Sequence, residues 1–312
     1  MSLQQQQEKE VLIILLDLNS YYWSKFHADY IKAQSEAQRK GKPFEQLQIE
    51  EIIECITLHI FNHIGQSAQN SARLYRFDEV ECKQVFPVND MDKSLIKMMD
   101  FGQVREIIKD RILDYIDQKQ LNIVQYSKII QALGKSLCYL NKTSVDMGRV
   151  TEKGRNVAGK ILIVFNSEVP NECFNQLMSC TFICQQRNWF IDCVTLNSKK
   201  HDYLLQASAK TKGLYFFAKN PTRGMMQYFM QVFNLKGSER TNFCMPYLTF
   251  TPFNSSCDCH NQKVDIAWIC SRCLGVYCKK GKEACNGICQ FCGVRFDLAD
   301  FNQKLMIEEG SS

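Results

Sequence analysis

The sequence predicts a doubly wound, mostly parallel α/β sheet with helices on both faces, followed by a small metal-binding module. Three observations support this prediction. An unbroken apolar run at residues 11–16 is typical of a strand buried on both faces, as in a parallel sheet. Strand and helix patterns alternate over residues 161–233, which indicates an open α/β sheet. Eight of the 16 cysteines crowd between Cys257 and Cys292.

Composition narrows the class of protein. The chain has 312 residues, of which 45% are hydrophobic and 23% are charged, as in an ordinary globular protein with one large or two modest domains. The apolar run at 11–16 is too short to span a bilayer or to form a signal-peptide core, so we expect a cytosolic or nuclear protein. The net charge of +5 is mild and comes without a dense Lys/Arg run, so it does not by itself indicate nucleic-acid binding.

The first half of the chain starts with a polar tail, residues 1–10, before the strand at 11–16. A polar insertion at 34–48 precedes a helix with isoleucines three and four residues apart on one face: Ile49, Ile52, Ile53, Ile56, Ile60 and Ile64. Residues 73–77 and 81–86 resemble two short strands of a hairpin. Apolar periodicity predicts helices over 104–116 and 126–140, and the polar stretch 141–160 is interpreted as a loop.

The second half alternates regularly. We predict strands at 161–165, 190–196 and 214–217, and helices at 171–188, 203–211 and 222–233. Gly213 ends the second of these helices, and the third turns Met225, Met226, Phe229 and Phe233 inward. The predicted domains are a sheet domain at 11–245, a linker at 246–256, a zinc-binding module at 257–298 and a tail at 299–312.

The strongest motif is a pair of cysteine knuckles. Cys270 and Cys273 are followed fifteen residues later by Cys289 and Cys292, a C-x2-C-x15-C-x2-C spacing typical of a structural zinc site. A two-residue spacer lets both sulfurs of a knuckle face one ion at about 2.3 Å, and two knuckles complete a tetrahedron. Four thiolates leave no position for water, so we expect structural zinc.

A second metal site is a candidate in the same region. Its possible ligands are Cys257, Cys259, His260, Cys278 and Cys285, which would interleave with the first site. Cys285 is the weakest of these, because residues 279–285 resemble an insertion. A very small apolar core is expected from Ile266, Trp268, Val276, Tyr277, Phe291 and Phe296. So little apolar surface predicts a module that needs metal to fold.

Chemistry in an open α/β sheet is expected beyond the carboxyl ends of its strands. Asp17, Asn19 and Tyr21 follow the first strand, without a glycine-rich phosphate-binding turn. This segment resembles the metal motif Asp-x-Ser-x-Ser of the von Willebrand factor A family, with Asn19 and Tyr21 in place of both serines. Asn166 stands where that family has a later aspartate. A hard cation needs several closely set oxygens, so we expect no Mg²⁺ here. We also predict no catalytic residues.

The whole pattern is similar to a narrower family, general transcription factor IIH subunit 3. That family combines an A-type domain with a C-terminal cysteine module, and the resemblance covers residues 11–296. The cysteine module contributes Cys257, Cys259, His260, Cys270, Cys273, Cys278, Cys289 and Cys292. The most specific segments in the sheet domain are residues 17–19, 21–23, 136–140, 191–193, 204–207, 213–215, 227–228 and 232–233.

The resemblance implies a non-enzymatic structural subunit of the TFIIH core complex. Such a subunit acts in RNA polymerase II initiation and nucleotide excision repair, in the nucleus. The implied partner is chiefly the other A-domain subunit, whose zinc-binding RING-like module docks on this family's A domain. Helicase subunits are further partners, DNA is contacted only within the complex, and no membrane is involved.

Two alternatives remain at the level of sequence. The cysteines and His260 allow a RING-like ubiquitin ligase with a substrate-binding A domain, although His260 precedes the knuckles instead of lying between them. Direct DNA binding by the zinc module is the other alternative. The cations available for phosphates are Arg272, Lys279, Lys280, Lys282 and Arg295.

Overall fold

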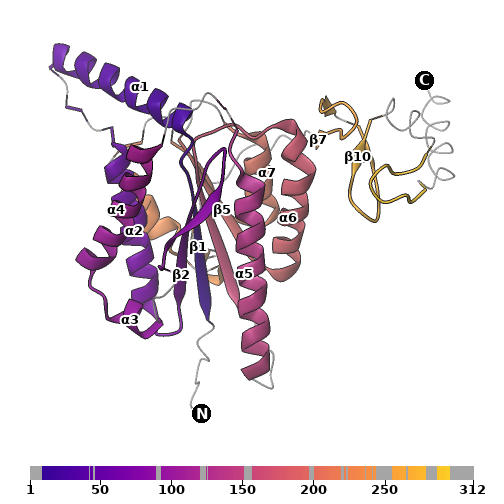
Figure 1. Cartoon of the computed structure of the whole chain (residues 1–312), viewed down its shortest axis with the longest axis horizontal. Coiled ribbons are helices and arrows are strands. Elements are labelled where there is room, and N and C mark those ends of the chain that lie inside the picture. The colour runs from indigo at the N-terminus through magenta and orange to yellow at the C-terminus, as the bar shows by residue number, and fades with distance from the viewer. Residues whose placement is uncertain are drawn as a thin grey trace. The chain divides into compact units, whose positions relative to one another are not determined.

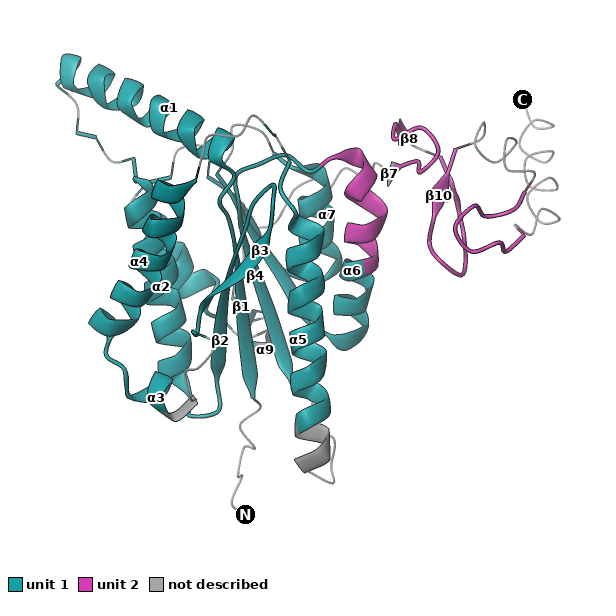
Figure 2. Ribbon diagram, in the orientation of Figure 1, with its two compact units in different colours: residues 1–169, 180–251 teal, residues 170–179, 252–312 magenta. Residues whose placement is uncertain are grey.

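The structure, a computed structural model, divides into two compact units (Figure 2). The first comprises Met1–Val169 and Cys180–Thr251, and the second Pro170–Ser179 and Pro252–Ser312. The described residues are 9–41, 43–44, 46–88, 93–119, 124, 126–150, 157–196, 200–218, 221–222, 224–235, 237–240, 242–243, 255–264, 266–278 and 287–295. The predicted linker and tail lie largely outside these residues, so their boundaries stay predictions.

A six-stranded sheet forms the first unit, in the order β3-β2-β1-β4-β5-β6. All neighbouring strands run parallel except β3, which pairs with β2 as an antiparallel hairpin. This order confirms the doubly wound fold predicted from the sequence. The strands are β1 (Glu10–Asp17), β2 (Ser71–Phe77), β3 (Cys82–Phe86), β4 (Ala158–Phe165), β5 (Phe190–Thr195) and β6 (Tyr215–Phe217).

Helices cover both faces of the sheet (Figure 1). One face carries α2 (Ile49–Gln66), α3 (Lys93–Met98) and α4 (Phe101–Gln118), and the other carries α5 (Ile129–Val150), α6 (Phe174–Arg187) and α7 (Asp202–Lys210). The remaining helical segments are α1 (Ser20–Arg39), η1 (Asn171–Cys173), α8 (Gly224–Gln227), the π-helical turn η2 (Tyr228–Val232) and α9 (Gly237–Arg240).

Strand β1 shows why the sheet is buried on both sides. Its residues Val11–Leu16 are at most 1% exposed, because alternate side chains point to opposite faces. On one face, Leu12 and Ile14 join the core beneath α2 and α4, where Ile52, Ile56 and Ile60 of the predicted isoleucine stripe are fully buried. The continuous apolar run is therefore the sequence signature of a central parallel strand.

Two predictions about secondary structure and one about the orientation of a side chain are wrong. Residues 34–39 belong to helix α1 and not to a polar insertion, and residues 141–150 continue α5 instead of forming a loop. The α5 extension is polar, but its Thr143 is buried at 7% exposure and bonds back to the carbonyl of Tyr139. Met226 is 39% exposed, whereas Met225 and Phe229 are buried as predicted.

The second unit includes η1 and the first residues of α6, and its described strands are each two residues long. β7 (Ser255–Ser256) pairs with β8 (Lys263–Val264), and β9 (Trp268–Ile269) pairs with β10 (Val276–Tyr277), both antiparallel. Val276 and Tyr277 are buried as predicted, but Ile266 and Phe291 are 82% and 66% exposed. Phe296, the last residue of the predicted core, lies outside the described residues.

Among the described helices, none combines the length and the apolar character required for crossing a membrane.

Candidate metal centres and the strand-end site

The two predicted knuckles form one cluster of thiols. The sulfur atoms of Cys270, Cys273, Cys289 and Cys292 all lie within 4.8 Å of one another. The sulfur of Cys270 lies 3.4 Å from that of Cys292, and the sulfur of Cys273 lies 3.4 Å from that of Cys289. Each close pair therefore joins one cysteine from each knuckle. Such convergence of four soft ligands is the arrangement that a tetrahedral metal ion requires.

Local backbone geometry produces this convergence. The N–H of Cys270 donates to the carbonyl of Gly275 at 2.9 Å, and the N–H of Leu274 donates back to Cys270 at 2.9 Å. Leu274 takes a φ of 61°, which lets the chain reverse immediately after the second cysteine. The turn at Cys289 repeats the pattern, with the corresponding positive φ at Gly293, a residue without a side chain to oppose it.

Tyr277 supports this cluster from behind. Its hydroxyl lies 3.3 Å from the sulfur of Cys289 and accepts the N–H of Gln290 at 3.1 Å. The residue is fully buried, and the small core around it consists largely of the cysteines themselves, with Trp268 and Val294 packed alongside. The position of Cys289 is therefore set by a neighbour outside the ligand set, as metal ligands commonly require.

A second cluster joins four of the five further candidates. Ligand atoms of Cys257, Cys259, His260 and Cys278 also lie within 4.8 Å of one another. Cys285 lies outside the described residues, as do three of the cations considered for DNA binding, Lys279, Lys280 and Lys282. The other two cations, Arg272 and Arg295, are exposed.

The strand-end site centres on Asp17, which is completely buried. Its Oδ1 accepts the hydroxyl of Ser127 at 2.6 Å and the N–H of Asn19 at 3.2 Å. Its Oδ2 accepts the N–H groups of Asn166 and Ser167, at 3.1 and 2.8 Å, and the Ser167 hydroxyl. Burial raises the pKa of Asp17, while the hydrogen bonds from Ser127 and Ser167 oppose that rise.

Asn19 and Tyr21 form part of the N-terminal cap of α1. The side-chain oxygen of Asn19 accepts the N–H groups of Tyr21 and Tyr22 at 3.1 and 3.3 Å, which is an N-cap. Its amide nitrogen donates to the carbonyl of Val124 at 2.9 Å. Of the three motif residues Asp17, Asn19 and Tyr21, only Asp17 therefore has its side chain at the centre of the strand-end network.

Ser127 and Ser167 are the participants that sequence reasoning missed. Ser167 is the second residue after β4, so its position at the end of a central strand was an available signal. Ser127 precedes α5 and is separated from Asp17 by 110 residues, and nothing in its local sequence marks it. The two hydroxyl oxygens lie 2.7 Å apart, so both serines and Asp17 form one buried network.

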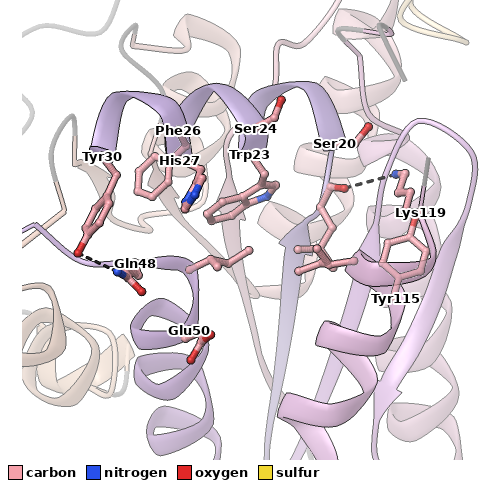
Figure 3. A pocket seen from close by; sticks show the side chains of 13 residues that line it. Ser20, Trp23, Ser24, Phe26, His27, Tyr30, Gln48, Glu50, Tyr115 and Lys119 are labelled. Carbon is pink, nitrogen blue, oxygen red and sulfur yellow. Dashed lines mark hydrogen bonds between the residues drawn. The ribbon is translucent and has the colours of Figure 1, made fainter. Parts of the chain in front are cut away.

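A recess of about 350 Å³ lies beneath α1, between the starts of α1 and α2 and the end of α4 (Figure 3). Trp23, His27 and Tyr30 project from α1 into it, and Glu50 lies on the opposite side. The charged groups of its lining are engaged: Lys119 contacts Glu79 at 2.9 Å, and Glu50 contacts Lys109 at 3.3 Å. Its walls are mainly aromatic and aliphatic, so the recess suits an apolar group.

Sequence comparison agrees with the family resemblance. The chain matches the family model "Transcription factor Tfb4" over residues 9–293. It is 27% identical to "General transcription factor IIH subunit 3" of Dictyostelium discoideum over 236 residues, which cover 70% of this chain and 60% of that protein. It is 22% identical to "General transcription and DNA repair factor IIH subunit tfb4" of Schizosaccharomyces pombe over 256 residues, or 80% and 79% of the two chains.

Structural comparison supports the same conclusion about the fold. The crystal structure of the TFIIH p34 N-terminal domain superposes with a TM-score of 0.57 and 21% identity, and the match covers 72% of this chain and 97% of that one. At this identity the likeness shows a shared fold. Because the family model spans most of the sequence, including the described cysteine clusters, the chain belongs to the transcription factor Tfb4 family.

Proposed function

We propose that this protein is a non-enzymatic structural subunit of the TFIIH core complex. In this role it acts in the nucleus, in RNA polymerase II transcription initiation and in nucleotide excision repair. Membership of the Tfb4 family supports the proposal, as do the names of relatives, which describe subunits of a general transcription and DNA repair factor IIH.

The observation that carries the non-enzymatic proposal is the saturation of Asp17. Ligands and metals of this type of fold bind at the carboxyl ends of the strands, where Asp17 lies. Here both carboxylate oxygens accept hydrogen bonds from Ser127, Ser167 and nearby backbone groups. A hard cation would have to displace these donors, so we propose that the strand ends hold no Mg²⁺ and serve as a rigid frame for protein contacts.

The proposed cofactor is zinc, bound by Cys270, Cys273, Cys289 and Cys292. The convergence of their sulfurs fits the group, because a four-sulfur tetrahedral set selects zinc among common structural metals. Four protein ligands leave no open coordination position for a substrate or an activated water. The ion would therefore supply folding free energy to the module and take no part in a reaction.

The proposed partners are those that the family resemblance implies. The A domain would dock the other A-domain subunit through its RING-like module, and the zinc module would offer a second contact surface. Helicase subunits would be held directly or indirectly. DNA would be contacted only as part of the complex, and no membrane would be involved.

Affinity purification of the tagged full chain from nuclear extract tests this function. We expect two helicase-type ATPases and the other A-domain subunit at equal stoichiometry by quantitative mass spectrometry. Cys273→Ser should weaken the contacts made through the zinc module and leave the other A-domain subunit bound. Cys138→Ser is the matched control, because Cys138 is exposed on α5 and remote from both clusters in sequence. Recovery of ubiquitin-conjugating enzymes without the helicases would contradict the proposal and favour the ligase.

A further inference from the structure

The turn that begins at Cys257 has the same backbone geometry as the two cysteine knuckles. The N–H of Cys257 donates to the carbonyl of Gln262 at 3.0 Å, and the N–H of Asn261 donates back to Cys257 at 2.9 Å. Asn261 takes a φ of 53°, at the same position as Leu274 in the Cys270 turn. In this third turn, His260 occupies the position of the second cysteine.

Ligand atoms converge around this third turn. Nδ1 of His260 lies 3.1 Å from the sulfur of Cys259 and 3.3 Å from that of Cys278, and the sulfurs of Cys259 and Cys278 are 3.4 Å apart. Cys257 completes the set, with its sulfur 3.9 Å from the same His260 nitrogen. Three thiols and one imidazole nitrogen are thus directed to a common centre, as in a Cys₃His site.

Asp258 fixes this turn against strand β10. Its N–H donates to the carbonyl of Val276 at 2.8 Å, and its Oδ2 accepts the N–H of Val276 at 2.8 Å. Cys278 lies just after β10, so the same two hydrogen bonds bring it beside Cys259 and His260. Asp258 is therefore a positioning residue that sets the distance between the two parts of the cluster.

We propose that Cys257, Cys259, Cys278 and His260 bind a second zinc ion, with His260 contributing Nδ1. Their order in the chain interleaves the two sites, because Cys278 lies between the two knuckles of the first. These four side chains complete a tetrahedral set without Cys285. This inference is linked to the proposed zinc site at Cys270, Cys273, Cys289 and Cys292, because both ions would stabilise the same module. The ligands of the two sites are different residues.

The two sites communicate through adjacent residues. Tyr277 supports Cys289 of the first site, and the next residue, Cys278, is a ligand of the second. Metal at the second site therefore holds the strand that positions Tyr277. Loss of the second ion should accelerate release of the first.

Zinc content of the purified full chain is the direct test. We expect two zinc ions per chain for the wild type by elemental mass spectrometry, and one for His260→Ala. His260→Cys should restore two, because a thiolate replaces the imidazole at the same knuckle position. Cys285→Ser should keep two, and Cys273→Ser is the control that disables the first site.

Cobalt substitution gives a readout that does not depend on a variant folding. The first and second equivalents of Co²⁺ should produce different visible spectra in the wild type, one typical of four sulfurs and one of three sulfurs and a nitrogen. In His260→Cys both equivalents should give the four-sulfur spectrum. If His260→Ala lost all metal by unfolding, the cobalt titration of the wild type would still show whether a second site with three sulfurs and one nitrogen exists.

Three results would overturn the inference. A wild-type chain that holds one zinc, removed by Cys273→Ser, would exclude the second site and leave the proposed first site intact. A chain that holds two zinc ions but drops to one in Cys285→Ser would show that the ligand set is wrong. Absence of zinc from the wild type under reducing, chelator-free conditions would contradict both sites.

Discussion

Asp17 is a buried carboxylate whose acceptor capacity is used by the protein itself. Donors from the residues that follow β1 and β4 and from the segment before α5 meet on its two oxygens, so one side chain joins three parts of the sheet domain. Hydrogen bonds to a charged acceptor contribute about 1.5–3 kcal/mol each when their partners cannot otherwise be satisfied. Asp17 lies at the carboxyl ends of the strands, where this type of fold usually binds ligands, and here its hydrogen bonds stabilise the sheet domain itself.

Replacement of Asp17 should destabilise the sheet domain strongly. We expect Asp17→Ala to lower the free energy of unfolding by roughly 3 kcal/mol, because it leaves buried N–H and hydroxyl donors unpaired. Asp17→Asn should also destabilise, since one acceptor oxygen becomes a donor. Urea denaturation measures the effect, with Ser24→Ala on the exposed side of α1 as control. Stabilisation of the wild type by Mg²⁺, absent in Asp17→Asn, would contradict this interpretation.

His59 should make the stability of the sheet domain depend on pH. Burial lowers its pKa to about 3, and nearby Lys160, His63 and Arg240 add to the effect. In the unfolded chain this histidine is protonated near pH 6.5. The folded state therefore loses stability as the pH falls from 6.5 towards 3. Between pH 7 and 5.5 we expect a loss of about 1 kcal/mol from this residue.

Urea unfolding at these two pH values, compared between variants, isolates the His59 contribution. His59→Leu should reduce the difference between pH 7 and 5.5 by that amount. The exposed His27 offers a control in His27→Gln, which should keep the wild-type difference. Equal pH dependence in the wild type and His59→Leu would refute the assignment.

At the scale of elements, the connection from α7 to β6 shows how closely helices and strands approach. The helix ends through Lys212, which takes a φ of 56°, and not through Gly213 as the sequence predicts. Gly213 has a different task, because a Cβ atom there would overlap the carbonyl oxygen of Ile191 on β5. The absence of a side chain lets β6 begin directly beside β5.

Gly213→Ala should therefore cost stability although alanine is the better helix former. We expect the free energy of unfolding to fall by about 2 kcal/mol or more, since a backbone carbonyl has to shift. Gly134→Ala is the matched control within α5, where a Cβ atom meets nothing within 4 Å. This control should gain about 0.5–1 kcal/mol. Thermal denaturation of both variants gives the comparison, and a neutral Gly213→Ala would refute the close approach.

At the scale of the whole molecule, the two units obtain their stability from different sources. The sheet domain buries a large apolar core on both faces of its strands. In the described cysteine-rich part of the second unit, Cys270, Tyr277 and Cys289 are buried with few apolar neighbours, and Ile266 and Phe291 are exposed. A core of this size does not offset the conformational entropy of the module, so metal ligation has to contribute.

Removal of metal should therefore unfold the cysteine module and leave the sheet domain folded. With excess chelator, peptides covering residues 257–278 and 287–295 should lose their protection in hydrogen–deuterium exchange. Strands β1 and β4 should keep theirs, because apolar burial holds them. Chelator saturated with zinc beforehand is the control. Unchanged protection of the module after confirmed metal loss would contradict the proposed dependence.

Much of this architecture could be predicted from local sequence. The apolar run of β1, the isoleucine stripe of α2 and the spacing of Cys270, Cys273, Cys289 and Cys292 each reflect a repeat within one element or turn. The polar end of α5 was missed because its helix propensity is unremarkable and its burial depends on tertiary packing.

The sequence by itself determined most of the strands and helices, the fold class and the first cysteine cluster, because periodicity and short spacing are properties of neighbouring residues. Only the tertiary structure decided which groups meet across long separations. Ser127 reaches Asp17 over 110 residues, and Arg240 pairs with the buried Asp192 of β5 over 48. Such pairs depend on which strands lie side by side and on where a loop returns, and neither is encoded in the residues next to them.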